Sequence, residues 1–206
     1  MRLPQRLPGV PGDGTAMAGV YETRGAPVST DARTILALDP ANRTGWAYLT
    51  ADGRRLYGAW DLRQPWDDHP GDRLRRLHDG LAEFLGRYPA ELIACEDAHY
   101  GTKNHEIAAL HAELRGVVKL VAREHNAGYV AFKPSTIKKF ATGYGLAKKP
   151  QMVAACKRLL CVDVDDDNIA DALFILELAR QSRPAPATKP KGRRSQKRGP
   201  QGRLFK

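Results

Sequence analysis

Residues 35–48 of this 206-residue chain read Ile-Leu-Ala-Leu-Asp-Pro-Ala-Asn-Arg-Thr-Gly-Trp-Ala-Tyr. The apolar run over 34–38 has the length of a buried strand and ends in one aspartate, Asp39. A turn follows, and a second apolar run begins at Thr44. A carboxylate at the end of a buried strand lies at a sheet edge, where proteins bind ligands such as metal ions and phosphates. Taken alone, Asp39 is equally consistent with an Asx turn that merely ends the strand.

Working outward from this stretch, the pattern predicts an α/β domain. Asp52-Gly53 is a hairpin signal, so the strand after it runs antiparallel and closes a three-stranded meander. The continuous apolar run at 92–95 is typical of a strand buried on both faces in a parallel sheet. We therefore expect a mixed five-stranded sheet, an antiparallel meander followed by parallel strands, with helices on both faces. The predicted strands are 34–38, 45–49, 56–62, 90–95 and 128–132, and the predicted helices are 72–88, 104–126, 134–140, 149–160 and 168–181.

Charge divides the chain into three parts. The net charge is +10, yet segment 34–182 carries none of it: segment 183–206 holds nine basic residues and no acidic one, and segment 1–33 holds four basic and three acidic residues. We expect a folded domain at 34–182, a disordered Pro- and Gly-rich segment at 1–33, with Met17 as an alternative start, and a basic disordered tail at 183–206. Such a tail either serves as an electrostatic arm for nucleic acid or is simply solvated.

Apolar and cysteine patterns bear on compartment. The chain has no run of 18 apolar residues and no apolar core behind its N-terminal arginines, so neither a membrane span nor a secretory signal is expected. Its three cysteines, Cys95, Cys156 and Cys161, lack zinc-ligand spacing. These features predict a protein of the reducing cytoplasm.

Carboxylates recur at the ends of the predicted elements. If the strands before Asp39 and Glu96 are parallel neighbours, both side chains emerge at one sheet edge. Asp167 and Asp171 are four residues apart and share a helix face, with Asn168 close to it. Hard oxygen ligands of this kind suit Mg²⁺ or Mn²⁺, and two ions about 4 Å apart would support phosphodiester hydrolysis. The alternatives are a structural salt bridge for Asp171 and helix-capping or loop roles for Asp163, Asp165 and Asp166.

Positive charge in the otherwise neutral domain gathers in residues 133–158, which contain no acidic residue. Lysines and aromatic side chains around a Gly-rich loop suit contacts to DNA phosphates and bases, although two solvated helix faces would look similar. The predicted DNA-binding residues of this segment are Lys138, Lys139, Phe140, Tyr144, Lys148 and Lys149. Further contacts are expected near the carboxylates from Arg43, His99, Tyr100 and Lys103.

Four blocks of the chain, in order and spacing, resemble RuvC-type Holliday junction resolvases, especially the compact phage and prophage versions. The blocks are Leu38-Asp39-Pro40 with Thr44-Gly45-Trp46-Ala47, Ala94-Cys95-Glu96 with Lys103-Asn104 and 114–118 downstream, Thr142–Lys149, and Asp166–Leu173. The resemblance covers about residues 34–180 and implies a ribonuclease H-like fold, a homodimer, and Mg²⁺-dependent cleavage of four-way DNA junctions.

The same resemblance implies Asp39, Glu96 and Asp171 as metal ligands. The family has an aspartate or histidine three residues before the last aspartate, where this chain has Asn168. The fourth ligand is therefore either the Asn168 carbonyl or Asp167. The family's cellular members place an aromatic residue at the position of His99, so stacking on the junction falls to Tyr100 or to the 140–146 loop, or is weaker.

These observations predict a structure-selective endodeoxyribonuclease that nicks two strands symmetrically and leaves 5′-phosphate ends. A DNA-binding module without catalysis is the first alternative, since loss of a fourth ligand would begin such a change. An actin-like ATPase is the second, because such enzymes also use a strand-end aspartate, but the chain lacks their glycine-rich adenosine motif.

Overall fold

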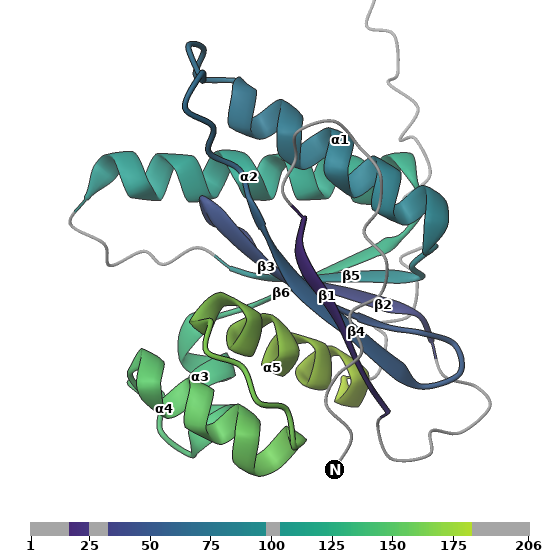
Figure 1. Ribbon diagram of the computed structural model, residues 1–206, viewed down its shortest axis with the longest axis vertical. Helices are drawn as coiled ribbons and strands as arrows, with labels where there is room; N and C mark the ends of the chain where they lie inside the picture. The colour runs from purple at the N-terminus through teal and green to yellow at the C-terminus, as the bar shows by residue number, and fades with distance from the viewer. Residues whose placement is uncertain (1–16, 25–32, 98–103, 183–206) are drawn as a thin grey trace, which may run out of the picture.

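Six strands form one mixed β-sheet at the centre of the molecule (Figure 1). The computed structural model describes residues 17–24, 33–97 and 104–182. The order across the sheet is β1-β4-β3-β2-β5-β6, antiparallel from β1 to β2 and parallel from β2 to β6. The strands are β1 Met17–Arg24, β2 Ile35–Asp39, β3 Arg43–Leu49, β4 Arg54–Asp61, β5 Leu92–Glu96 and β6 Gly128–Phe132.

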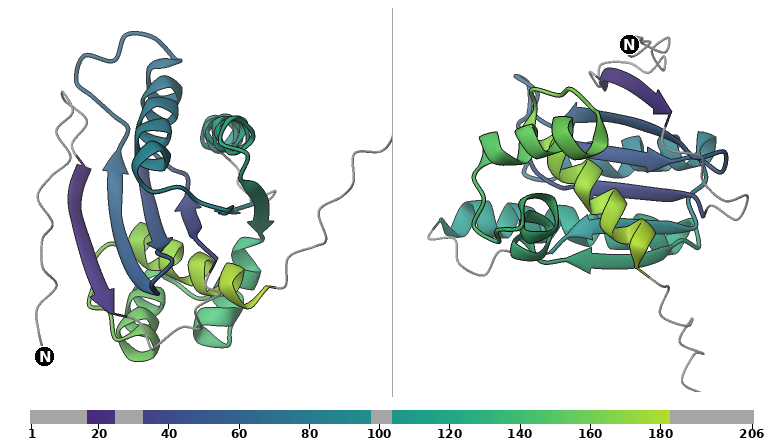
Figure 2. Two further views of the ribbon diagram at one scale, coloured as in Figure 1. Left: turned by 90° about the vertical axis from the view of Figure 1, so that its right-hand side faces the viewer. Right: turned by 90° about the horizontal axis from the view of Figure 1, so that it is seen from below.

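Helices cover both faces of this sheet, as the edge-on view in Figure 2 shows. One face packs against α1 Asp72–Arg87 and α2 His105–Glu124. The other packs against α3 Pro134–Thr142, α4 Lys149–Ala155 with its π-helical continuation Cys156–Leu160, and α5 Asp167–Gln181. Alternate residues of β2 serve the two cores: Leu36 and Leu38 face α1 and α2, while Ile35 and Ala37 face α5. The predicted α/β fold, with its meander followed by parallel strands, is confirmed.

The expected disorder of residues 17–24 is corrected by β1. These residues pair antiparallel with β4 and add a sixth strand to the five that were predicted. Pro and Gly flank this segment and hid a short stretch of strand-forming residues, Val20, Tyr21 and Thr23. Tyr21 stacks on Tyr57 of β4 with ring centroids 5.6 Å apart. The expectations for 1–16, 25–32 and 183–206 fall outside the described residues.

Helix α5 packs on the sheet face that α3 and α4 also cover, and its buried side chains belong to the hydrophobic core on that face. It packs against β2 and β3, and nine of its side chains are buried, so it has almost no polar face. Asp166 caps its N-terminus by accepting the Asn168 N–H. Among the described residues, the longest apolar helical stretch falls short of what a bilayer crossing requires.

Candidate active site

Strand pairing brings two carboxylates together. Parallel β2 and β5 are in register with Leu38 opposite Cys95, so the next residues, Asp39 and Glu96, leave the sheet at the same edge and on the α5 face. Asp39 is only 8% exposed. Burial, and then the neighbouring Glu96 charge, hold the pKa of Asp39 well above its ordinary value. Burial also raises the pKa of Glu96, and a hydrogen bond between the two side chains ties these carboxyl groups together.

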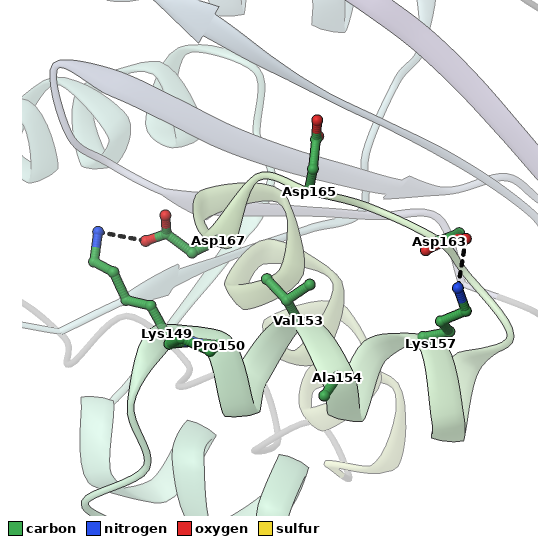
Figure 3. A pocket seen from close by; sticks show the side chains of 8 residues that line it. All are labelled: Lys149, Pro150, Val153, Ala154, Lys157, Asp163, Asp165 and Asp167. Atoms are coloured by element: carbon green, nitrogen blue, oxygen red, sulfur yellow. Dashed lines mark hydrogen bonds and ion pairs between the residues drawn. The ribbon is translucent and has the colours of Figure 1, made fainter.

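Helix α5 adds two carboxylates to this edge. Burial, and then the charge of Asp39, raise the pKa of Asp171 to about 7. One buried oxygen of Asp171, Oδ1, has no hydrogen-bond partner. Asp167 lies one turn earlier and forms a 2.5 Å ion pair with Lys149 Nζ (Figure 3). That contact raises the pKa of Lys149. The four predicted acidic side chains therefore lie close enough together for their charges to interact.

The donor chemistry of this group fits a hard divalent cation. Within residues 17–24, 33–97 and 104–182, no three acidic, histidine or cysteine side chains are arranged as a ready-made metal-binding group. Asp39 and Glu96 share a hydrogen bond instead, and Asp167 faces Lys149. Yet all four side chains offer carboxylate oxygens, which Mg²⁺ and Mn²⁺ prefer, and the unpartnered Asp171 oxygen is costly to bury without a cation.

A glycine fixes how closely α5 approaches this edge. Gly45 of β3 is the antiparallel partner of Asp39, and cross-strand partners point to the same face. A Cβ on Gly45 would lie 2.0 Å from the Asn168 carbonyl oxygen. The absence of a side chain there lets the first turn of α5 lie beside Asp39. Sequence reasoning gave Gly45 no role, and a glycine within a strand was the one available signal.

Two lysines border the carboxylates. Lys138 of α3 and Lys149 of α4 both act to lower the pKa of Asp171, against the larger effect of burial. Arg115 of α2 acts in the same direction on Glu96, a contribution that sequence reasoning missed. Among the described residues, positive charges that act on the carboxylates of Glu96 and Asp171 therefore come from three helices.

The other predicted DNA-binding residues are distributed unevenly. Lys139, Lys148 and Tyr144 are exposed, and Tyr144 shows 58% of its surface. Phe140 instead packs edge-to-face on Phe174 in the core, with ring centroids 6.4 Å apart. Phe140 is half-buried on α3, so Tyr144, which follows the end of that helix, is the exposed aromatic side chain of residues 140–146. His99, Tyr100 and Lys103 lie outside the described residues.

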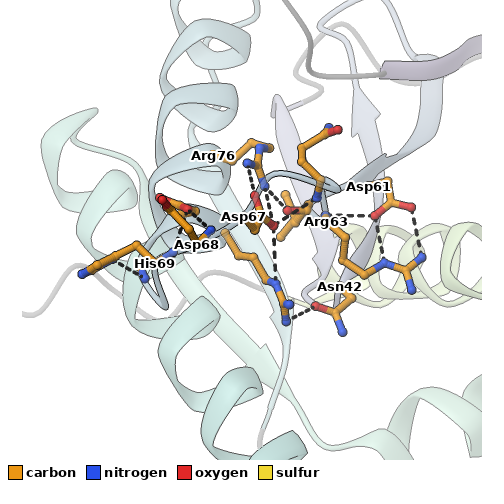
Figure 4. Close-up of polar contacts among 12 residues, drawn as sticks. Asn42, Asp61, Arg63, Asp67, Asp68, His69 and Arg76 are labelled. Carbon is orange, nitrogen blue, oxygen red and sulfur yellow. Dashed lines mark hydrogen bonds and ion pairs between the residues drawn. The ribbon is translucent and has the colours of Figure 1, made fainter.

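Arg43 lies at the start of β3 but is tied to α5. Its Nε donates to Asp166 Oδ2 over 2.5 Å. The preceding residue, Asn42, accepts a hydrogen bond from Arg73 of α1, whose neighbour Arg76 pairs with Asp67 (Figure 4). The turn after Asp39 is thus braced by arginine contacts to both helical layers.

Comparison with known proteins places the chain in a family. Residues 35–177 match the family model described as crossover junction endodeoxyribonuclease RuvC. A protein of that name from Rhodopseudomonas palustris is 36% identical over 146 residues, 68% of this chain and 83% of that protein. Its namesake from Rhodopirellula baltica is 33% identical over 151 residues, 70% of this chain and 84% of that protein. In fold, the chain resembles T. thermophilus RuvC in complex with Holliday junction substrate, with a TM-score of 0.61, 23% identity, and coverage of 72% and 96% of the two chains. The chain belongs to the family of crossover junction endodeoxyribonuclease RuvC.

Proposed function

We propose that this protein is a divalent-metal-dependent endodeoxyribonuclease that resolves four-way DNA junctions. The observation that carries the proposal is the meeting of Asp39, Glu96 and Asp171 from β2, β5 and α5, with a buried, unpartnered Asp171 oxygen. The proposal includes a homodimer that nicks two strands symmetrically and leaves 5′-phosphate ends. It also includes a cytoplasmic setting and a phage or prophage branch of the family, the latter resting on the compact 34–182 domain.

The metal would be held by Asp39, Glu96 and Asp171, with Asp167 or the Asn168 carbonyl as fourth ligand. Two Mg²⁺ or Mn²⁺ ions held there would supply the Lewis acidity that phosphodiester hydrolysis needs. Asp39 is buried and Glu96 and Asp171 are half-buried, which strengthens the attraction between their charges and a cation. Asp167 would join this set only by giving up its ion pair with Lys149.

Lysine side chains would bind the DNA phosphate at this edge. Lys138 and Lys149 lie beside the carboxylates, so a phosphate placed between them faces positive charge on one side and the ligand set on the other. Lys149, once released from Asp167, is placed to offset the negative charge that develops on the phosphate. Lys139, Lys148 and Tyr144 extend the contact surface outward, with His99, Tyr100 and Lys103 as further predicted contacts.

A junction-binding protein without catalysis is the alternative that two observations favour. Asn168 replaces an acidic or histidine ligand, and Asp167 is engaged with Lys149. Such a protein would bind junctions in EDTA but release no product in Mg²⁺ or Mn²⁺. The actin-like ATPase alternative is set aside by the family match over residues 35–177.

Substitution of Asp39 tests the proposal. With a synthetic four-way junction, Asp39→Asn is expected to abolish cleavage in Mg²⁺ and in Mn²⁺ while junction binding in EDTA persists, because the change removes a ligand and not the basic surface. Asp165→Asn is the matched control, since Asp165 is an exposed acid just before α5. Full cleavage by the Asp39 variant would refute the site. No cleavage by the unmodified protein would favour the binding module.

A further inference from the structure

Arg43 and Asp166 form a link between β3 and the first turn of α5. Asp166 uses its two carboxylate oxygens for two different tasks: Oδ1 accepts the Asn168 N–H as helix cap, and Oδ2 accepts from Arg43 Nε. The Asp166 side chain is only 12% exposed, so the contact is shielded from solvent on the acid's side. One carboxylate therefore fixes both the start of the helix and its attachment to the strand.

This link lies beside residues that must be placed accurately. Arg43 is two residues before Gly45, which pairs with Asp39, and Asp166 is one residue before Asp167. Asp39 and Asp171 are more than 130 positions apart in the sequence, so their relative position depends on how α5 docks on β2 and β3. The close approach at Gly45 sets the distance between β3 and the helix, but a bare glycine contact does not prevent sliding. An ion pair at the helix start supplies that restraint.

We propose that Arg43 is a positioning residue, which acts through Asp166 to hold Asp167 and Asp171 in register with Asp39 and Glu96. The proposal rests on the proposed metal-dependent function for its consequence, but the restraint itself is a property of the fold. Outer partners of metal ligands commonly change metal affinity by roughly 10- to 100-fold when removed. Arg43 contacts Asp166, which is not itself a proposed metal ligand. Removal of Arg43 should therefore lower metal affinity by a factor near the lower end of that range.

A direct contact between Arg43 and DNA is the competing role, and the two have different signatures. A DNA contact contributes to junction affinity with or without metal. Loss of a positioning residue lowers metal affinity in the absence of DNA. It also lets the first turn of α5 open more often. Cross-strand Asp61 also lies near Arg43 but is paired chiefly with Arg63, so it does not replace Asp166 as partner.

The test uses the full chain at pH 8 with three variants of Arg43 and Asp166. Arg43→Ala removes the link, Arg43→Lys keeps its charge, and Asp166→Asn keeps the cap while removing the acid's charge. Arg54→Ala is the control. Arg54 pairs with Asp52 at the opposite end of the β3–β4 hairpin, and its exposure (44%) is similar to that of Arg43 (40%), whereas Asp52 is far more exposed than Asp166 (59% against 12%).

Three measurements are made on each variant: Mn²⁺ affinity by calorimetry without DNA, junction affinity in EDTA, and hydrogen exchange of the peptide 165–172. For Arg43→Ala and Asp166→Asn we expect Mn²⁺ affinity to fall roughly 10-fold, exchange in the peptide to accelerate, and junction affinity to stay within about twofold. Arg43→Lys should recover most of the Mn²⁺ affinity, and Arg54→Ala should leave all three unchanged.

The opposite pattern would overturn the proposal. Weaker junction binding with unchanged Mn²⁺ affinity and exchange would make Arg43 a DNA contact, and no change in any measurement would make the pair a surface contact without consequence. Failure of the unmodified protein to bind Mn²⁺ would refute the proposed metal site instead. Hydrogen exchange would still decide whether the link holds α5.

Discussion

At the scale of single residues, Asp171 shows most directly the electrostatic strain within the candidate site. Its carboxyl group is buried beside Asp39, and Oδ1 lacks any hydrogen-bond partner. A proton relieves this strain at low pH, and a divalent cation would relieve it at high pH. Functional groups that are arranged for a ligand are commonly destabilising in its absence, which leads to a measurable consequence for folding.

We predict that Asp171→Asn stabilises the protein in EDTA, and more at pH 8 than at pH 4. The carboxyl group titrates near 3.8 in the unfolded chain and near 7 in the folded one. Its favourable contribution is therefore complete below about pH 4 and lost as pH rises through 7, by up to about 4 kcal/mol. Urea denaturation at the two pH values checks this, with Asp165→Asn as control. An equal effect of Asp171→Asn at both pH values would contradict the prediction.

At the scale of elements, the contact between β3 and α5 is the one on which the geometry of the candidate site depends most. Gly45→Ala would place a methyl group 2.0 Å from the Asn168 carbonyl oxygen, which is backbone and cannot rotate away. We expect a loss of at least about 2 kcal/mol in the free energy of unfolding, together with loss of cleavage. Gly80→Ala on α1 is the control, because its Cβ meets nothing within 4 Å and should gain about 1 kcal/mol. Unchanged urea midpoints for Gly45→Ala would show that the helix shifts without cost.

This contact between β3 and α5 is also the part of the site that could not be predicted from the sequence. Period and turn signals located β2 to β6 and the five α-helices of the described residues, because each pattern is local. Examples are Asp52-Gly53 for the hairpin and the apolar run at 92–95 for β5. The carboxylates were found because they end or interrupt apolar elements. Gly45, Arg43 and Arg115 were missed or given other roles, since their contacts join segments far apart in the chain. Strand β1 was missed because it forms by pairing with β4, and this pairing cannot be recognised from the sequence of residues 17–24 alone.

At the scale of the whole molecule, β1 lies outside the part of the chain that matches the family. The family match begins at residue 35, whereas β1 ends at Arg24 and covers the edge of β4. An uncovered edge would expose the β4 backbone and one side of Tyr57. We therefore treat β1 as a stabilising addition that lies at the far side of the sheet from β5 and β6.

Deletion of residues 1–24 should lower stability without removing catalysis. A loss of about 1 kcal/mol shifts Tm by roughly 2–4 °C in a domain of this size, and we expect at least that, with more aggregation on heating. Junction cleavage below the lowered Tm should keep its rate, because the carboxylates come from β2, β5 and α5. Deletion of residues 1–16 alone, which spares β1, is the control. A cleavage rate that falls at a temperature where the truncated protein is folded would give β1 a part in the site.

The distribution of charge predicts how the chain binds DNA as a whole. Segment 183–206 supplies nine positive charges and segment 34–182 supplies none on balance, so the tail should provide much of the long-range attraction to DNA. We predict that replacing the tail's lysines and arginines with glutamine weakens junction binding in EDTA and lowers the salt dependence. The slope of log affinity against log salt should shrink by roughly 0.9 for each DNA phosphate that the tail no longer neutralises.

At saturating junction the cleavage rate should be unchanged, because the tail acts before the chemical step. The control replaces Lys138 and Lys149, which should reduce the rate at saturation. An unchanged salt slope would assign the phosphate contacts to residues 133–158 and leave the tail a solvated end.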